Sequence, residues 1–210
     1  MSRESFISAT RNILKSNSAT LWDCGSKVDT HENLVHAIDA LLATNVANIC
    51  TNEQECLELL ILGCKAINTL SEQLISKFSK LLFSIFNKQQ FNFNSNTLRE
   101  SLEVLLSFLI DAYSSCAYTS TKVDILRALS KVLYENGNQC EKFHVRLLNT
   151  LISLAQPDNP QLEIRRMAIN CLGNLSARTG NKLNGKYRSI YDVLFANLNA
   201  GITESDEIAS

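Results

Sequence analysis

The chain has 210 residues, 20 of them basic and 21 acidic, and a formal net charge of -1. A charge balance this even creates no long-range field that would attract a polyanion, so it disfavours nucleic-acid binding. Only 7 glycines and 2 prolines occur, too few for the frequent turns of a β-sandwich or barrel, whereas 45% apolar residues suffice for a packed core.

The first fifty residues predict two helices separated by a loop. Residues 3–16 carry a weak helical pattern, and the polar stretch 17–29 contains Gly25, which favours a loop. Thr30 is expected to cap a second helix, whose apolar positions continue to Val46. The N-terminus has no apolar run typical of a signal peptide, and no run in the chain approaches the ~18 residues of a membrane span.

The middle of the chain predicts a series of amphipathic helices. Thr51 and Gln54 match a capping box, and the helix after them continues to Ile67. Further apolar stripes predict helices over residues 71–86, 97–117 and 123–133, with a connection at 87–96 and a short turn at 118–120. Gly137 is expected to end the third of these helices in the left-handed conformation.

The last third of the chain predicts three more helices. Apolar residues recur at helical spacing over 143–154, 164–175 and 188–198. Asn159 is expected to cap the middle one, with Pro160 at its first position, where a missing N–H costs nothing. Residues 180–185 are expected to form a loop, and residues 201–210 a disordered tail.

The predicted helices form pairs that begin near residues 52, 97 and 140, at spacings of 45 and 43 residues. Two antiparallel helices in about 40–47 residues are typical of a HEAT or armadillo solenoid. We therefore expect an all-α fold of about nine helices, a right-handed α–α superhelix that forms one domain over 1–210. In it, 1–29 hold the weak helix and loop and 30–200 the stacked pairs. Periodicity alone leaves a compact helical bundle open.

One stretch resembles the second helix of a HEAT repeat. Pro160 is followed by Ile164-Arg165, then by Ala168 and by Leu172-Gly173-Asn174-Leu175, which is the family's order of residues. Asn159 stands where the family usually has an aspartate, so the family's ion pair with the arginine, here Arg165, is not expected. A closer resemblance covers about 70–200. It rests on residues 70–86, 105–109, 125–129, 134–143, 163–166 and 171–175, and it is to the N-terminal region of the family of HEAT repeat-containing protein six. This resemblance implies a scaffold without catalytic residues.

The seven cysteines indicate a reducing compartment, the cytoplasm or the nucleus, because their number is odd and no secretory signal precedes them. They stand at positions 24, 50, 56, 64, 116, 140 and 171. Cys50, Cys56 and Cys64 lack the spacing of a metal knuckle, and packing is expected of them. Cys140 and His144 stand four residues apart, within contact on one helix, but nothing nearby indicates a nucleophile.

Two further motifs resemble known sites only in part. Residues 180–187 approach a phosphate-binding loop, but Tyr187 takes the place of the required serine or threonine and a helix precedes them. His31 and His36 stand five residues apart, whereas a zinc-binding helix needs four to bring both to one face. We expect a glycine-containing loop and surface histidines instead.

Arg146, Arg165 and Arg166 are the candidate binding residues, because with Lys142 and Arg178 they give the most basic local composition. On a solenoid they could line a groove for an acidic peptide or a phosphate. The alternative is a solvated face in which Arg165 bonds a neighbouring repeat.

The functional hypothesis is a non-catalytic scaffold that binds a protein partner, without cofactor, metal or membrane. The alternative is a compact all-α bundle with a small-molecule pocket or a reactive thiol. Because the last helix begins a pair whose second member is missing, we also expect the chain to be the N-terminal part of a longer repeat protein, whose further repeats would cover this helix.

Overall fold

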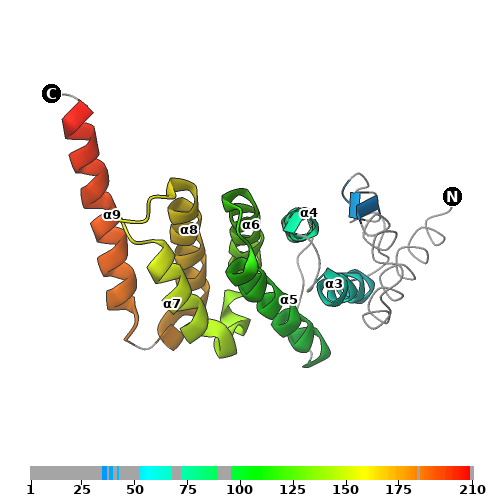
Figure 1. Ribbon diagram of the computed structural model, residues 1–210. Helices are drawn as coiled ribbons and strands as arrows, with labels where there is room; N and C mark the ends of the chain where they lie inside the picture. Colours follow the sequence, from blue (N-terminus) through cyan, green and yellow to red (C-terminus); the bar gives the residue numbers. More distant parts are fainter. Residues whose placement is uncertain are drawn as a thin grey trace. The chain divides into compact units, whose positions relative to one another are not determined.

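The computed structural model describes residues 35–36, 38–39, 42, 53–67, 72–88, 96–183 and 185–208. Over these residues the regular structure is entirely helical, with seven α-helices of defined bounds, three 3-10 helices and no strand (Figure 1). The expected all-α class is confirmed. The helix, loop and cap predicted before residue 35 lie outside the described residues.

The chain divides into two compact units, Met1–Lys131 and Val132–Ser210. The first unit contains α3 (Glu53–Ile67), α4 (Glu72–Lys88), α5 (Asn96–Ser115) and most of α6 (Thr119–Asn136). The four helices predicted over this part of the chain are confirmed, and their ends shift by a few residues. Leucine, isoleucine and phenylalanine at helical spacing form the buried faces.

The core of the first unit joins α3, α4 and α5. α3 contacts both α4 and α5. The Phe78 ring of α4 meets the Phe108 ring of α5 edge to face, with centroids 5.4 Å apart. On α3, Gly63 lies so close to Phe78 that a β-carbon there would be 2.6 Å from its Cζ atom. These three helices therefore pack around one aromatic side chain.

A polar contact joins α4 to α6. The buried carboxylate of Asp124 accepts a hydrogen bond from Ser76 Oγ at 2.8 Å and forms an ion pair with Lys80 Nζ at 3.2 Å. Next to it on α4, Lys77 Nζ donates to Asp39 Oδ1 at 2.5 Å and to Oδ2 at 2.6 Å. α4 therefore has polar partners both earlier and later in the chain.

Glu72, in the first turn of α4, fixes the start of α6. Its carboxylate accepts hydrogen bonds from the backbone N–H groups of Ala117 at 3.1 Å and Tyr118 at 2.7 Å. A negative charge at a helix N-terminus satisfies donors that have no partner within the helix and interacts favourably with the helix dipole.

The second unit begins with the last turn of α6. It continues through the 3-10 helices η2 (Gly137–Gln139) and η3 (Glu141–Phe143), α7 (His144–Leu154), α8 (Leu162–Thr179), the 3-10 helix η4 (Gly180–Leu183) and α9 (Tyr187–Ile208). α7 contacts α8 and α9, and α8 contacts η2. The helices predicted at 143–154, 164–175 and 188–198 are confirmed here.

The predicted left-handed cap at Gly137 is wrong. Gly137 is buried at the start of η2, and the glycines with positive φ in the described residues are Gly180 and Gly185. The physical reason for glycine here is space, because a β-carbon at Gly137 would lie 2.8 Å from Arg178 Cβ on α8. Gly137 thus permits a close approach between two segments.

The predicted cap of α8 by Asn159 is also wrong. α8 begins at Leu162, after Gln161, which makes no side-chain cap hydrogen bond. Asn159 instead closes the preceding turn, since its Oδ1 accepts from the Gln161 N–H at 3.0 Å and its Nδ2 donates to Leu154 O at 2.8 Å. An asparagine that bonds the backbone two residues on competes with capping.

The last helix is longer than predicted. α9 continues to Ile208, so the disordered tail expected from residue 201 is helical as far as that residue. The segment after Leu198 contains no proline and a single glycine, and nothing in it forces a helix to end. Among the residues that the structure describes, no helix has the length and apolarity needed to cross a membrane.

Candidate protein-interaction surface

One face of α9 is occupied by α7. Ile190 and Val193 are buried, and Asn197 Nδ2 donates to Ala155 O, at the end of α7, over 2.7 Å. These three positions follow one another at steps of three and four residues, which places them on a single side of the helix. α9 is therefore fixed on the second unit by its own apolar seam and one polar contact.

A second face of α9 is apolar and exposed. Tyr187, Tyr191, Phe195 and Leu198 retain 40%, 66%, 50% and 66% of their surface. They recur at steps of four, four and three residues, so they form one stripe about 120° around the helix from the buried seam. We call these four residues the α9 stripe.

Two members of the α9 stripe already pack on each other. The rings of Tyr191 and Phe195 stack with centroids 5.9 Å apart and planes 11° apart. Aromatic groups that are held in place and exposed lose little conformational freedom on binding, and such residues are enriched in protein interfaces. A contiguous apolar patch of this kind is typical of an interaction surface.

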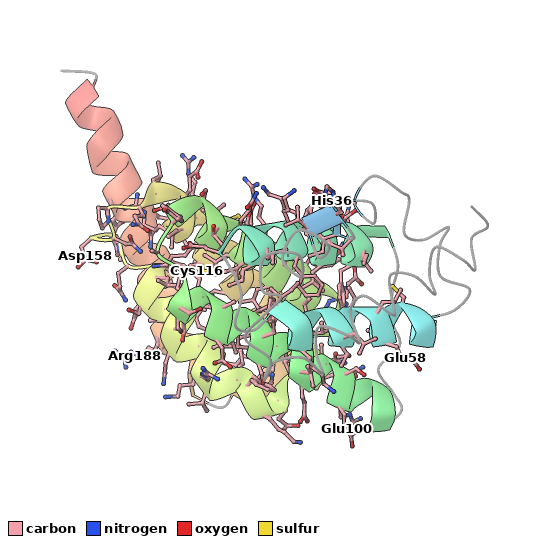
Figure 2. The ribbon with its side chains drawn as sticks, turned by 45° about the vertical axis from the view of Figure 1, so that its right-hand side comes forward. His36, Glu58, Glu100, Cys116, Asp158 and Arg188 are labelled. Atoms are coloured by element: carbon pink, nitrogen blue, oxygen red, sulfur yellow. The ribbon has the colours of Figure 1, made fainter. Side chains whose placement is uncertain are left out.

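The C-terminal end of α9 extends past the other helices of the second unit. In both views the end of α9 extends beyond α7 and α8 (Figures 1 and 2). Figure 2 shows Arg188 at the other end of α9, directed away from the helices of this unit.

Helical spacing over 188–198 predicted this helix but not its second apolar face. The apolar residues that carry this spacing include Ile190 and Val193, which form the buried seam. The signal for the stripe was present, because three aromatic residues at steps of four indicate a second apolar face beside the first.

The predicted arginines do not form one site. Arg165 is directed to its own helix pair, where Nη1 donates to Pro157 O at 2.6 Å. Arg146 and Arg166 are exposed near the beginnings of α7 and α8. Helices joined by a short loop run in opposite directions, so these two arginines lie toward opposite ends of the pair.

The cysteines of the described residues are buried: Cys56, Cys64, Cys116, Cys140 and Cys171. Burial raises the pKa of Cys140 to about 12. It also raises the pKa of Cys116, together with the nearby negative charge of Glu72, to about 11, and burial likewise raises the pKa of Cys64. Thiols of this kind are protonated at neutral pH and react slowly, because the thiolate is the nucleophile.

Cys140 and His144 bond backbone carbonyls and not each other. Cys140 Sγ donates to Asn136 O at 3.2 Å, and His144 Nε2 lies 3.1 Å from Gly137 O. Cys140 thus bonds the last carbonyl of α6 and His144 the first carbonyl of η2, and the arrangement stabilises the junction between α6 and α7. It is a packing role, not the geometry of an activated nucleophile.

The remaining partial motifs are also accounted for. The loop predicted over 180–185 is in part a 3-10 helix, η4, which begins at Gly180. Gly180 and Gly185 adopt positive φ, 52° and 73°, and the segment follows the helix α8, whereas a phosphate-binding loop follows a strand. His36 is exposed, and His31 and Cys50 lie outside the described residues. The described part of the chain contains no group of three histidine, cysteine or acidic residues that could hold a metal ion.

The comparison with known proteins finds six matches, and one of them illustrates the similarity. An uncharacterized protein of Dictyostelium discoideum is 39% identical over 83 residues, which is 38% of this chain and 6% of that protein. The chain therefore matches a small part of a relative about six times its length. No family model matches the sequence, and no solved structure matches it.

Proposed function

We propose that this chain is a non-catalytic helical-repeat scaffold of the HEAT or armadillo type, and that it binds a protein partner through the α9 stripe. In this proposal the helices form a right-handed superhelix of about nine, in line with the period of the sequence. The observation that carries the binding function is the exposed stripe of Tyr187, Tyr191, Phe195 and Leu198.

The contacts within each unit support a repeat architecture. In the first unit α3 contacts α5, and Ser76 of α4 bonds Asp124 of α6. In the second unit α7 contacts α9, and Arg178 of α8 bonds Tyr134 of α6. Helices two apart in the chain thus lie side by side, as they do when helix pairs stack.

The polar side chains support binding over catalysis. The residues that the sequence singled out, Arg165, Cys140 and His144, bond backbone carbonyls of their own unit. The resemblance to the family of HEAT repeat-containing protein six belongs to this proposal and brings no catalytic residue. The buried thiols fit a cytoplasmic or nuclear setting, where cysteines remain reduced.

Crosslinking with mass spectrometry in a cell extract tests the proposal. We expect a protein partner whose crosslinks gather around α9 and which is lost from a Tyr191→Glu variant. Arg166→Glu is the matched control, since it also changes the charge of an exposed helical residue, on α8. A partner retained by Tyr191→Glu and lost from Arg166→Glu would contradict the α9 stripe as the binding face.

Thiol titration of the native chain tests the alternative of a reactive cysteine. The scaffold proposal expects slow reaction at Cys64, Cys116 and Cys140, because the pKa of each is raised. One rapidly reacting thiol with a low pKa would favour the compact bundle with thiol chemistry over the scaffold.

A further inference from the structure

One end of the second unit brings together the start of α7, the end of α8 and the start of α9. Gly137 lies beside the first two, because its carbonyl oxygen is 3.1 Å from His144 Nε2 and a β-carbon on it would be 2.8 Å from Arg178 Cβ. η4 follows α8 directly, and α9 begins a few residues after it. Figure 1 shows these three helix ends at the same edge of the unit.

Exposed basic side chains from all three helix ends stand at this edge. Lys142 and Arg146 lie just before and just after the start of α7, and Arg178 lies in the last turn of α8. Lys186 and Arg188 lie at the start of α9. We call these five residues the basic end. The structure thus separates Arg146 from Arg166 and places it with basic residues that follow much later in the chain.

The positive charge of this region exceeds its negative charge. The two segments that form it, 135–146 and 178–192, contain six basic residues and three acidic ones. A surplus of three positive charges therefore remains even when every acid is paired. The whole chain has a net charge of -1, so the charges are distributed unevenly and the surplus is local.

The starts of α7 and α9 carry cations where helices favour acids. Neither helix has an acidic residue in its first turn, and each has an arginine there, Arg146 and Arg188. A positive charge at the start of a helix opposes the helix dipole and lowers the stability of the folded chain. A departure from such a local rule at two neighbouring helix ends is typical of a functional surface.

We infer that the basic end binds an acidic segment of a protein partner, through ion pairs with aspartate and glutamate carboxylates. The inference deepens the proposed function, because it adds a second contact to the α9 stripe and names the chemistry of the partner. Three of the five residues are arginines, and a guanidinium group can bind a carboxylate through two parallel hydrogen bonds.

The charge distribution favours a protein segment over an extended polyanion. A chain with a net charge of -1 has no long-range attraction for nucleic acid or for an anionic membrane. A surplus of charge at one edge acts over about 10 Å or less at moderate salt, which suits a short acidic peptide laid across three helix ends.

Fluorescence anisotropy of a fluorescein-labelled peptide of glutamates, titrated with the full chain, tests the inference. We expect a dissociation constant of about 10–100 μM at low salt, and weaker binding as salt is added. The double variant Arg146→Glu with Arg188→Glu is expected to bind at least ~10-fold more weakly. Arg99→Glu with Arg166→Glu is the matched control, because it changes the net charge equally at two exposed positions outside the basic end. Equal weakening by both double variants, or no binding by the wild type, would overturn the inference.

Two other probes test the class of the partner. Single-stranded oligothymidine represents nucleic acid, and vesicles of phosphatidylserine and phosphatidylcholine in equal amounts represent an anionic membrane. The glutamate peptide is expected to bind at least as tightly as either probe. Binding of the oligonucleotide or of the vesicles that is ~10-fold tighter or more, and that is lost in Arg146→Glu with Arg188→Glu, would contradict an acidic protein segment.

Arg188→Gln separates a binding role from a structural one. It removes a cation from the start of α9, so we expect the melting temperature to rise by about 1–3 °C while the peptide binds more weakly. A structural arginine gives the opposite sign. A lower melting temperature with unchanged peptide binding would show that Arg188 stabilises the fold, and it would contradict its place in the basic end.

The inference and the proposed function fail separately. A partner in the cell extract that is lost from Tyr191→Glu and retained by Arg146→Glu with Arg188→Glu would overturn the basic end and keep the α9 stripe. Peptide binding that is lost only in Arg146→Glu with Arg188→Glu, together with a partner that Tyr191→Glu retains, would keep the basic end and contradict the α9 stripe.

Discussion

Arg178 contacts Tyr134 in two ways at once. Its Nε atom donates a hydrogen bond to Tyr134 O at 2.5 Å, and its guanidinium carbon lies 5.0 Å from the centre of the Tyr134 ring. A cation over an aromatic ring adds electrostatic attraction to the hydrogen bond. Together these contacts hold the end of α6 against α8, and they require Gly137 to lie directly beside the stem of Arg178.

Gly137→Ala is expected to lower the free energy of unfolding by about 1–3 kcal/mol, because the added methyl group overlaps Arg178 Cβ and the two segments must separate. Gly173→Ala is the matched control. No atom lies within 4 Å of a β-carbon at Gly173, in the middle of α8, so alanine is expected to raise stability by about 0.5–1 kcal/mol. Urea unfolding measures both, and equal effects at the two glycines would contradict the close approach at Gly137.

Arg165→Ala is expected to cost about 1–2 kcal/mol, because the carbonyl of Pro157 loses a hydrogen bond from a charged donor. Arg166→Ala removes the same charge from the neighbouring, exposed position and is expected to change stability by less than about 0.5 kcal/mol. Thermal unfolding of the two variants at one pH separates the contribution of the Arg165 hydrogen bond from that of the exposed Arg166 charge. A larger loss of stability in Arg166→Ala than in Arg165→Ala would contradict the structural role given to Arg165.

Glu72→Ala is expected to destabilise the chain by about 0.5–2 kcal/mol, since the N–H groups of Ala117 and Tyr118 lose their acceptor at the start of α6. Gln73→Ala, at the next and exposed position of α4, is the control and is expected to be nearly neutral. Hydrogen exchange adds a local readout. Faster exchange at the start of α6 in Glu72→Ala is expected, and unchanged exchange there would count against the cap.

The raised pKa of the Cys140 thiol predicts that the folded chain loses stability in alkaline solution. Its pKa is raised from 9.0 to about 12 by burial. Below pH 9 the thiol is protonated in both states, so its contribution is fully present. Between pH 9 and about 12 the thiol ionises in the unfolded chain alone, and stability falls by up to ~1.4 kcal/mol per pH unit.

The comparison with Cys140→Ala isolates this contribution. The difference in unfolding free energy between the wild type and the variant is expected to shrink as the pH rises above 9.0, because alanine has no proton to lose. Urea unfolding at a series of alkaline pH values measures it. A difference that stays constant over that range would show that the folded thiol ionises as readily as the unfolded one.

The helices could be predicted from the sequence because apolar periodicity is a local property. Leucine, isoleucine and phenylalanine at steps of three and four identified α4 and α8 with ends correct to a few residues. The end of α9 could not be located in the same way, since the helix continues beyond Leu198 through polar residues that contain no breaking signal.

The errors share a cause, which is contact with residues distant in the sequence. Gly137 follows an asparagine at a helix end and so matches a left-handed cap, but glycine is needed there because Arg178 on another helix lies too close for a β-carbon. The separation of Arg146 from Arg166 depends on the reversal of the chain between α7 and α8. The α9 stripe is the opposite case, because its aromatic spacing was visible in the sequence and only its exposure required the structure.

The position of Phe78 has a consequence for how the first unit unfolds. Its ring lies over Gly63 of α3 and against Phe108 of α5, so neither α3 nor α5 can separate from α4 without exposing the same aromatic side chain. Shared burial of this kind couples elements into one cooperative block. Slowly exchanging amides in α3, α4 and α5 are therefore expected to open with a single common free energy, as one foldon.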